Sequence, residues 1–171
     1  MEKNRTLKSY LHAGIVCLLF VMADQYTKYL AIIHLKGKAS FEMIPGVFEL
    51  QYLENRGAAF GLFQDRQVFF MLGALLIFFI VLYFYAKIPH QKRYYLMRAY
   101  AVLIVAGALG NMMDRLRLDY VVDFFYFSLI DFPIFNVADC YVVIGCALFA
   151  FSLLFYYTEE ELSCFSFSKK A

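Results

Sequence analysis

Residues 110–139 read GNMMDRLRLDYVVDFFYFSLIDFPIFNVAD, and this stretch decides how the rest of the chain is interpreted. It begins at the end of one long apolar segment and finishes at the start of the next. Its charged residues are Asp114, Arg115, Arg117, Asp119, Asp123, Asp131 and Asp139. A carboxylate at bilayer depth costs roughly 2.5–3.5 kcal/mol. We therefore expect these carboxylates to have either a partner or a chemical task.

The composition is that of a membrane protein. Of the 171 residues, 63% are hydrophobic and 20% are aromatic, and the mean hydropathy is +0.61. Charged residues make up 18%, below the share of about a quarter that is usual in soluble domains. A soluble chain of this length could hardly bury so much apolar surface. The composition therefore favours lipid as the solvent.

Four apolar segments are long enough to cross a bilayer whose hydrocarbon core is about 30 Å thick. They lie at about residues 11–33, 68–86, 99–115 and 136–157. The polar connection at 37–62 contains a Pro45-Gly46 turn and a partly alternating run, which predicts a small β-hairpin or meander on the membrane surface. We predict an all-α integral membrane protein that is a single domain over residues 1–171. Its four transmembrane helices carry this small β-structure and a loop at 116–135.

The distribution of Lys and Arg predicts the orientation of the chain. The N-terminus, the 87–98 loop and the tail carry nine of these residues, whereas the 34–66 connection and the 110–139 stretch carry six. Cytoplasmic segments of membrane proteins are enriched in Lys and Arg. We therefore expect both termini in the cytoplasm, and the carboxylate stretch on the outer face.

Two of the predicted spans carry residues that are unusual in a plain membrane anchor. Asp24 and Lys28 lie four residues apart in the first span, so they share one helix face and can pair. They are either a pair that reaches toward the outer interface or a polar face turned toward an interior site. Gly107 and Gly110 give the third span a smooth face for contact with another helix.

Common catalytic motifs other than carboxylates are absent from the sequence. It contains no H-E-x-x-H and no G-x-S-x-G, and no serine in a span lies close to a lysine or histidine. The four cysteines form no C-x-x-C, so neither a zinc site nor a disulfide framework is expected. We expect no metal and no cofactor.

Asp123 and Asp139 are the carboxylates best placed to act together. Asp123 lies in an apolar frame, and Asp139 lies at the start of the fourth span, so the loop between them returns to the same membrane face. Two carboxyl groups in a low dielectric do not both ionise, and such a pair can activate water and polarise a carbonyl group. Alternatively, Asp139 caps a helix and Asp123 lies in a loop. The spacing alone does not decide between these two interpretations.

Five short motifs follow one another among the four predicted spans. They are DQYTK at 24–28, NRGAAFG at 55–61, GNMMDR at 110–115, VVDF at 121–124 and FNVAD at 135–139. In this order and at these places the chain resembles lipoprotein signal peptidase, the signal peptidase II family of bacterial inner membranes. The resemblance covers most of the chain.

The resemblance implies a catalytic dyad of Asp123 and Asp139. It also implies that the following residues line or brace the site: Asp24, Lys28, Asn55, Gly57, Asn111, Asp114, Arg115 and Asn136. The implied substrate is a prolipoprotein whose cysteine carries diacylglycerol, cleaved just before that cysteine. The segment at 37–62 would be the small periplasmic β-cradle of the family. The implied protein is a multi-pass inner-membrane monomer that contacts lipid and binds no nucleic acid.

The chain departs from the family pattern at two places. Asp119 stands where a glycine is common, and Cys140 stands where relatives often have a serine. Aspartate tolerates left-handed backbone better than most residues, so we expect the turn at Asp119 to survive. We also expect Arg115, beside Asp114, to form a structural brace.

Two other functions compete with a peptidase. A small proton-coupled transporter could use Asp24, Asp114 and Asp139 as a relay, and a non-catalytic assembly factor is the third possibility. Transporters tend to show internal repeats, and this sequence shows none. Carboxylates grouped near one membrane face favour the peptidase.

Overall fold

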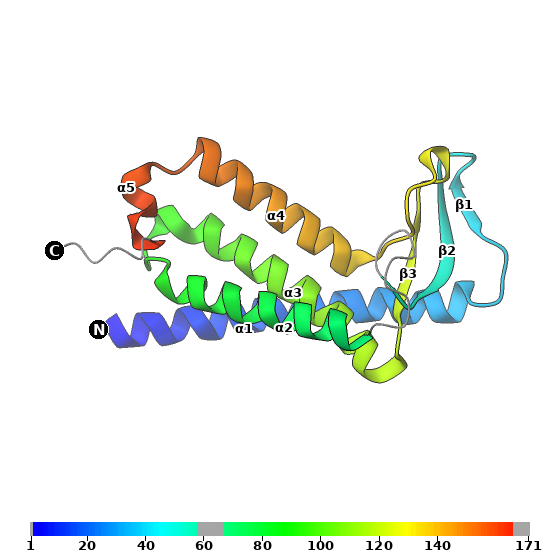
Figure 1. Ribbon diagram of the computed structural model, residues 1–171, viewed down its shortest axis with the longest axis horizontal. Coiled ribbons are helices and arrows are strands. Elements are labelled where there is room, and N and C mark those ends of the chain that lie inside the picture. Colours follow the sequence, from blue (N-terminus) through cyan, green and yellow to red (C-terminus); the bar gives the residue numbers. More distant parts are fainter. Residues whose placement is uncertain (1, 58–66, 166–171) are drawn as a thin grey trace.

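A computed structural model describes residues 2–57 and 67–165 of the chain. Within these residues, four long helices form an elongated bundle with a three-stranded sheet at one end (Figure 1). The helices are α1 (Glu2–Leu35), α2 (Gln67–Lys87), α3 (Tyr95–Leu118) and α4 (Val137–Phe155). The strands are β1 (Phe41–Ile44), β2 (Phe48–Asn55) and β3 (Val121–Tyr126). The shorter helices are η2 (Lys92–Tyr94), η3 (Ser128–Ile130), α5 (Glu159–Leu162) and η4 (Ser163–Phe165).

The bundle is that of an integral membrane protein. Thr6–Leu35, Lys92–Leu118 and Val137–Phe155 are each long and apolar enough to cross a bilayer, and Met71–Lys87 is a shorter apolar helix. Large apolar side chains point outward along the helices, as Leu154 does with 75% of its surface exposed. Such a surface is suited to lipid rather than water. The chain is therefore mostly helical, with three candidate membrane spans and a small sheet.

Glycines let α3 and α4 approach each other closely. A Cβ atom on Gly107 would overlap the Ala138 carbonyl oxygen and lie 2.7 Å from Val142 Cγ2. A Cβ on Gly145 of α4 would lie 2.9 Å from Ile104 Cγ1. Small residues at such contacts are the usual means of packing helices in a membrane. The predicted contact face at Gly107 is confirmed.

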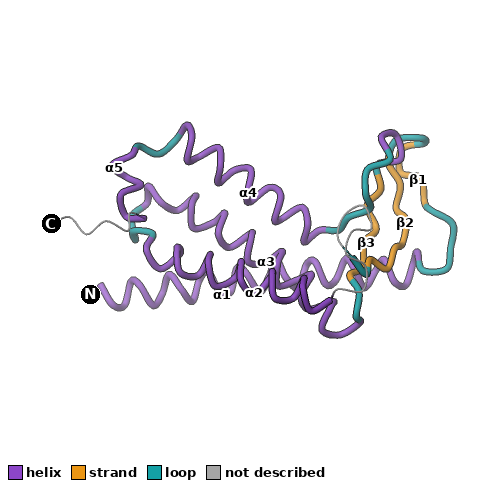
Figure 2. Tube along the Cα trace, in the orientation of Figure 1, coloured by secondary structure: helices purple, strands orange, loops and turns teal. Residues whose placement is uncertain are grey.

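The sheet contains a strand that the sequence analysis missed. β2 pairs antiparallel with both β1 and β3, with Asn55 opposite Val121 and Leu53 opposite Asp123. The 116–135 segment, predicted to be a loop, therefore supplies the third strand, so the sheet joins parts of the chain far apart in sequence (Figure 2). The first four residues of β3 are all buried, so this strand shows no alternation of apolar and polar residues.

The turn at Asp119 connects α3 to this strand. Asp119 has a φ of 63° and ends α3 in the left-handed conformation. Its backbone N–H donates to the Arg115 carbonyl oxygen at 3.3 Å. The expectation that aspartate preserves the turn is confirmed, and the chain enters β3 two residues later.

Two buried clusters hold the two ends of the bundle. One lies at the end away from the sheet and contains Tyr85, Ile88, Tyr94, Met97, Ala101 and Tyr157. The other contains Ala31, Leu35, Val122 and Phe124, so it fastens the end of α1 to β3. This second cluster fixes the sheet against the helices and thereby sets the position of Asp123.

Candidate active site

Asp123 and Asp139 reach the site from different elements. Asp123 lies in β3 between the buried residues Val122 and Phe124 and is 1% exposed. Asp139 lies in the first turn of α4. A connection that contains η3 joins β3 to α4, and the start of α4 lies beside β3 at the sheet end of the bundle (Figure 1).

Asn136 joins the two carboxyl groups. Its side-chain Nδ2 donates to Asp123 Oδ1 at 2.6 Å, and its backbone N–H donates to Asp139 Oδ2 at 3.1 Å. Its Oδ1 accepts from the Asp139 backbone N–H at 3.0 Å, so the two residues form a capping box at the start of α4. Asp139 therefore does cap a helix, as one of the two interpretations proposed, and it also lies in a polar cluster with Asp123.

The remaining oxygens of both carboxyl groups also have donors. Asn55 Nδ2 donates to Asp123 Oδ2 at 2.8 Å, while Asn55 Oδ1 accepts from the Gly57 N–H at 2.9 Å. Asn111 Nδ2 donates to Asp139 Oδ1 at 2.7 Å. Each of the four carboxyl oxygens thus accepts one hydrogen bond, so both side chains are held in fixed orientations.

A buried ion cluster lies behind these groups. Lys28 Nζ is 3.0 Å from Asp24 Oδ2 and 2.9 Å from Asp114 Oδ2, and none of the three residues is more than 3% exposed. The same Lys28 nitrogen donates to Asn111 Oδ1 at 2.9 Å. This decides between the two interpretations of the first span: the pair points into the protein. Lys28 contacts the residue that holds Asp139.

The two carboxylates of the ion cluster also bind backbone next to the candidate dyad. Asp24 Oδ1 accepts from the Ala138 N–H at 2.9 Å, immediately before Asp139. Asp114 Oδ2 accepts from the Val122 N–H at 3.2 Å, immediately before Asp123. The ion cluster thus fixes the backbone that carries each candidate catalytic residue.

The sequence analysis assigned no role to Gln25 and gave Gly110 only a role in helix contact, and both residues belong to the same cluster. Gln25 Nε2 donates to Asp114 Oδ1 at 2.8 Å and to the Gly110 carbonyl oxygen at 3.2 Å. A Cβ on Gly110 would lie 2.6 Å from Asp24 Oδ2. Gln25 lies in the DQYTK motif and Gly110 in the GNMMDR motif, and membership of these motifs was the signal that could have placed both residues in the site.

Arg115 does not form the brace in the way that we predicted. Asp114 makes its ion pair with Lys28, on another helix. The guanidinium of Arg115 is influenced by the negative charges of Asp139 and Asp123, and its Nη2 is 3.5 Å from the Gly57 carbonyl oxygen. Its position places a cation beside the two candidate catalytic carboxyl groups.

Burial controls the protonation of Asp123. Removal from water raises the pKa of this carboxyl group to about 7, and the neighbouring charge of Asp139 acts in the same direction. Hydrogen bonds from Asn55 and Asn136 and the charge of Lys28 oppose the rise. A carboxyl group with this pKa can hold a proton at neutral pH while a second carboxyl group is ionised, which is the requirement for acid–base catalysis by a pair.

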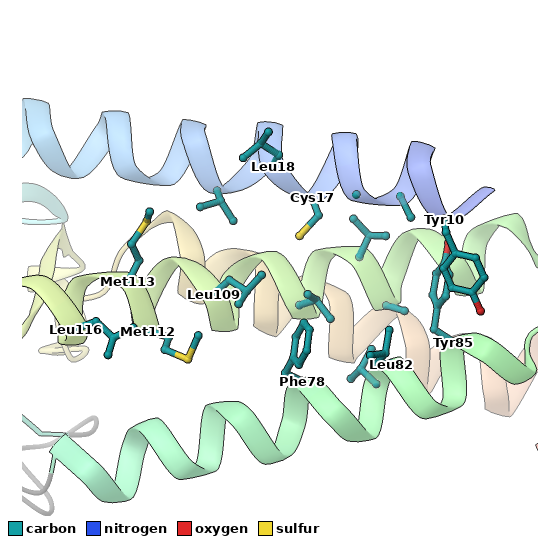
Figure 3. Close-up of a pocket in the computed structure, with 17 residues that line it drawn as sticks. Tyr10, Cys17, Leu18, Phe78, Leu82, Tyr85, Leu109, Met112, Met113 and Leu116 are labelled. Atoms are coloured by element: carbon teal, nitrogen blue, oxygen red, sulfur yellow. The ribbon is translucent and has the colours of Figure 1, made fainter. Parts of the chain in front are cut away.

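An apolar cavity of about 600 Å³ lies between α1, α2 and α3. Its lining side chains run from Tyr10 and Tyr85 at one end to Met113 and Leu116 at the other (Figure 3). Leu116 is one residue beyond Arg115, so this end of the cavity approaches the helix turn that carries part of the site.

The structure brings the predicted site residues together. The residues that lie within one connected set of hydrogen bonds and ion pairs are Asp24, Lys28, Asn55, Gly57, Asn111, Asp114, Arg115, Asp123, Asn136 and Asp139. Asp131 lies away from the set, exposed and bonded to the Tyr126 hydroxyl at 2.8 Å. Residues 58–61 of the second motif lie outside the described residues.

The chain is similar to known proteins over most of its length. The family model for signal peptidase (SPase) II matches residues 16–155. The lipoprotein signal peptidase of Caldanaerobacter subterraneus subsp. tengcongensis is 39% identical over 144 residues, which are 84% of this chain and 96% of that relative. The lipoprotein signal peptidase of Streptococcus pyogenes serotype M5 is 38% identical over 144 residues, which are 84% of this chain and 91% of that relative.

Solved structures of bacterial membrane enzymes have the same fold. One superimposes with a TM-score of 0.73 at 31% identity and covers 94% of each chain. A second superimposes with a TM-score of 0.71 at 33% identity, over 85% of this chain and 94% of the other.

Proposed function

Because this chain belongs to the signal peptidase II family, we propose that it removes the signal peptides of prolipoproteins, with Asp123 and Asp139 as its catalytic dyad. The observation that carries the assignment is Asn136, which binds both carboxyl groups at once. The pKa of about 7 at Asp123 supports a pair that shares one proton at neutral pH.

The two carboxyl groups have different tasks in this proposal. Asp139 is the ionised member, since it lies in the first turn of α4, where the positive end of the helix dipole favours a carboxylate. It removes a proton from a water molecule as the water oxygen attacks the scissile carbonyl carbon. Asp123 donates its proton to the carbonyl oxygen.

Cleavage then reverses these proton positions. The resulting diol returns a hydroxyl proton to Asp123 while Asp139 gives its proton to the amide nitrogen, and the C–N bond breaks. The products are the carboxyl end of the signal peptide and the free amine of the following residue. Both aspartates end the cycle in their starting states.

The ion cluster has a positioning role in this proposal. Asp24 and Asp114 hold the backbone before Asp139 and Asp123, and Lys28 forms an ion pair with each of these two carboxylates. Asn55, Asn111 and Asn136 orient the carboxyl groups. Arg115 and Gly57 complete the wall of the site beside the dyad.

The same proposal places the protein in the membrane. All four long helices cross the bacterial inner membrane as one monomer, both termini are cytoplasmic, and the sheet lies at the periplasmic face. The substrate cysteine carries diacylglycerol, and the apolar cavity between α1, α2 and α3 receives an acyl chain. Its wholly hydrophobic middle section is suited to hydrocarbon rather than to peptide.

The test is cleavage of a diacylglyceryl-modified precursor by the purified protein, followed as a mobility shift on a gel. The matched control is the same precursor without its lipid. We expect the lipidated form to be cut just before the modified cysteine and the unlipidated form to be a poor substrate. Equal turnover of the two forms would refute recognition of the lipid. A lipidated precursor that stays intact would refute the proposed peptidase activity.

A further inference from the structure

A second cavity, of about 940 Å³, lies at the end of the bundle away from the carboxyl pair, between α1, η2 and the first half of α3. Cationic or imidazole side chains line it on several sides: Lys8, His12, His90, Lys92 and Arg98. None of the described residues that line it is acidic. The cavity therefore has an unbalanced positive charge, and an anion is the ligand that this charge favours.

Arg98 is the most buried of these groups, with 6% of its surface exposed. Its guanidinium donates to the Ser9 hydroxyl at 3.1 Å and to the Ile88 carbonyl oxygen, and it lies 4.8 Å from the centre of the Tyr85 ring. Its buried Nε has no hydrogen-bond partner within residues 2–57 and 67–165. Among the residues that the structure describes, the groups that contact this cation are neutral, and a buried charge without a counter-charge is costly.

The other walls of this cavity are apolar. Val16 and Phe20 line it from α1, and Val102 and Leu103 line it from α3. Both helices are long and apolar enough to cross a bilayer. A ligand that satisfies both halves of the cavity therefore has an anionic head and a hydrocarbon tail.

We propose that this cavity binds an anionic glycerophospholipid, with its phosphate among Lys8, Lys92 and Arg98 and one acyl chain along Val16 and Leu103. Basic pockets between membrane helices are suited to anionic lipid headgroups. The site contains neither member of the candidate dyad, so it does not depend on the proposed function. It gives the bundle a fixed lipid at the end opposite the sheet.

The experiment measures lipid binding to the purified full chain by native mass spectrometry. The probes are phosphatidylglycerol, phosphatidylcholine with the same acyl chains, and inorganic phosphate as a competitor. We expect one phosphatidylglycerol to bind at least tenfold more tightly than phosphatidylcholine, and inorganic phosphate at the same concentration not to displace it. Equal affinity for the two lipids would overturn the charge argument. Displacement of phosphatidylglycerol by inorganic phosphate would show that the cavity binds phosphate without specificity for a lipid, and would overturn the lipid assignment.

Paired variants test the position of the site. Lys8→Gln with Lys92→Gln removes two exposed cations from the cavity, and each such cation contributes about 1 kcal/mol to anionic-lipid binding. Affinity for phosphatidylglycerol should therefore fall roughly thirtyfold. Lys36→Gln with Lys38→Gln makes the same change in charge at the sheet end and should leave the affinity unchanged. An equal loss in both pairs would show a nonspecific surface effect and would overturn the site.

Discussion

The Asn136 side chain donates a 2.6 Å hydrogen bond to Asp123 from the position that caps α4. One side chain thus starts a membrane helix and orients a carboxyl group on a neighbouring strand. The backbone N–H of the same residue binds Asp139 at 3.1 Å. The geometry of the candidate dyad is therefore set by the first turn of α4, and any change in that turn alters both carboxyl groups together.

Asn136→Ala tests this dual role. The variant loses a helix cap, which costs roughly 0.5–2 kcal/mol, and it removes the side chain that donates to Asp123, while the backbone donor to Asp139 remains. We expect cleavage of lipidated precursor to fall about a hundredfold, because small displacements of catalytic groups have effects of this size. The variant also lacks a hydrogen bond that favours ionised Asp123, so the pKa of Asp123 should rise. The alkaline decline in activity should therefore move to a higher pH than in the wild type.

Thr158→Ala is the matched control for Asn136→Ala. Thr158 forms the corresponding capping box with Glu161 at the start of α5, at the other end of the bundle. The control should leave both the cleavage rate and its pH profile unchanged. If Asn136→Ala lowered stability with no change in the pH profile, Asn136 would be a structural cap alone.

Much of the site could be predicted because its residues are local or belong to recognisable motifs. The four-residue spacing of Asp24 and Lys28 gave their pairing, and the five motifs gave the rest of the list. The pattern of apolar and polar residues did not reveal β3, because a strand that is buried on both faces lacks the alternation of apolar and polar residues that marks a half-buried strand. The pairing of Leu53 with Asp123 was therefore also missed.

Other contacts could not be predicted because they join a side chain to distant backbone. Asp24 accepts from the Ala138 N–H, 114 residues away in sequence, and no residue type at position 138 indicates such a bond. The same holds for Asp114 and the Val122 N–H. The ion pair of Asp114 with Lys28, rather than a brace with its sequence neighbour, depends on how α1 and α3 pack.

The variants Asp123→Asn and Asp139→Asn test the dyad itself. Each should leave the protein folded and inserted but lower cleavage by at least about a thousandfold, since general acid–base groups contribute up to 10⁴-fold each. Asp131→Asn is the control, because Asp131 is an exposed carboxylate bonded to Tyr126 in the same segment. Full activity in either dyad variant, measured on lipidated precursor, would refute the assignment.

The pH dependence of kcat/KM follows from the raised pKa of Asp123. Below about 7, Asp123 keeps the proton that it must donate, and as the pH rises through about 7 this proton is lost. Activity should therefore decline on the alkaline side, about tenfold per pH unit well above the pKa. Asn55→Ala removes a donor that favours the ionised form, so it should raise this pKa and move the decline to higher pH.

Two outcomes would contradict this assignment of the proton. One is a decline that stays in place, or moves to lower pH, in Asn55→Ala. The other is a decline that moves equally in Asp131→Asn, which does not contact Asp123 and should keep the wild-type profile. Either result would show that a different group holds the proton in the active enzyme.

Lys28→Met tests the ion cluster. The variant leaves Asp24 and Asp114 without their cation in a buried site, and breaking a buried pair typically costs about 3–5 kcal/mol. We expect a large drop in the midpoint of thermal unfolding, followed by far-UV circular dichroism in detergent. Lys36→Met breaks an exposed pair with Glu54, in which the lysine side chain is 50% exposed, and should change the midpoint little. Equal midpoints for the two variants would contradict the buried cluster.

Gly107→Ala tests the close contact of α3 with α4, on which the position of Asp139 depends. The added Cβ would overlap the backbone oxygen of Ala138, which cannot move without shifting the first turn of α4. We therefore expect lower thermal stability and at least a tenfold loss of cleavage from one methyl group. Gly73→Ala adds the same methyl group to α2, where no atom lies within 4 Å of it, and should leave both measurements unchanged or raise stability slightly. If Gly107→Ala behaved like this control, the helices would have room to separate, and the spacing between β3 and α4 would not be fixed by this contact.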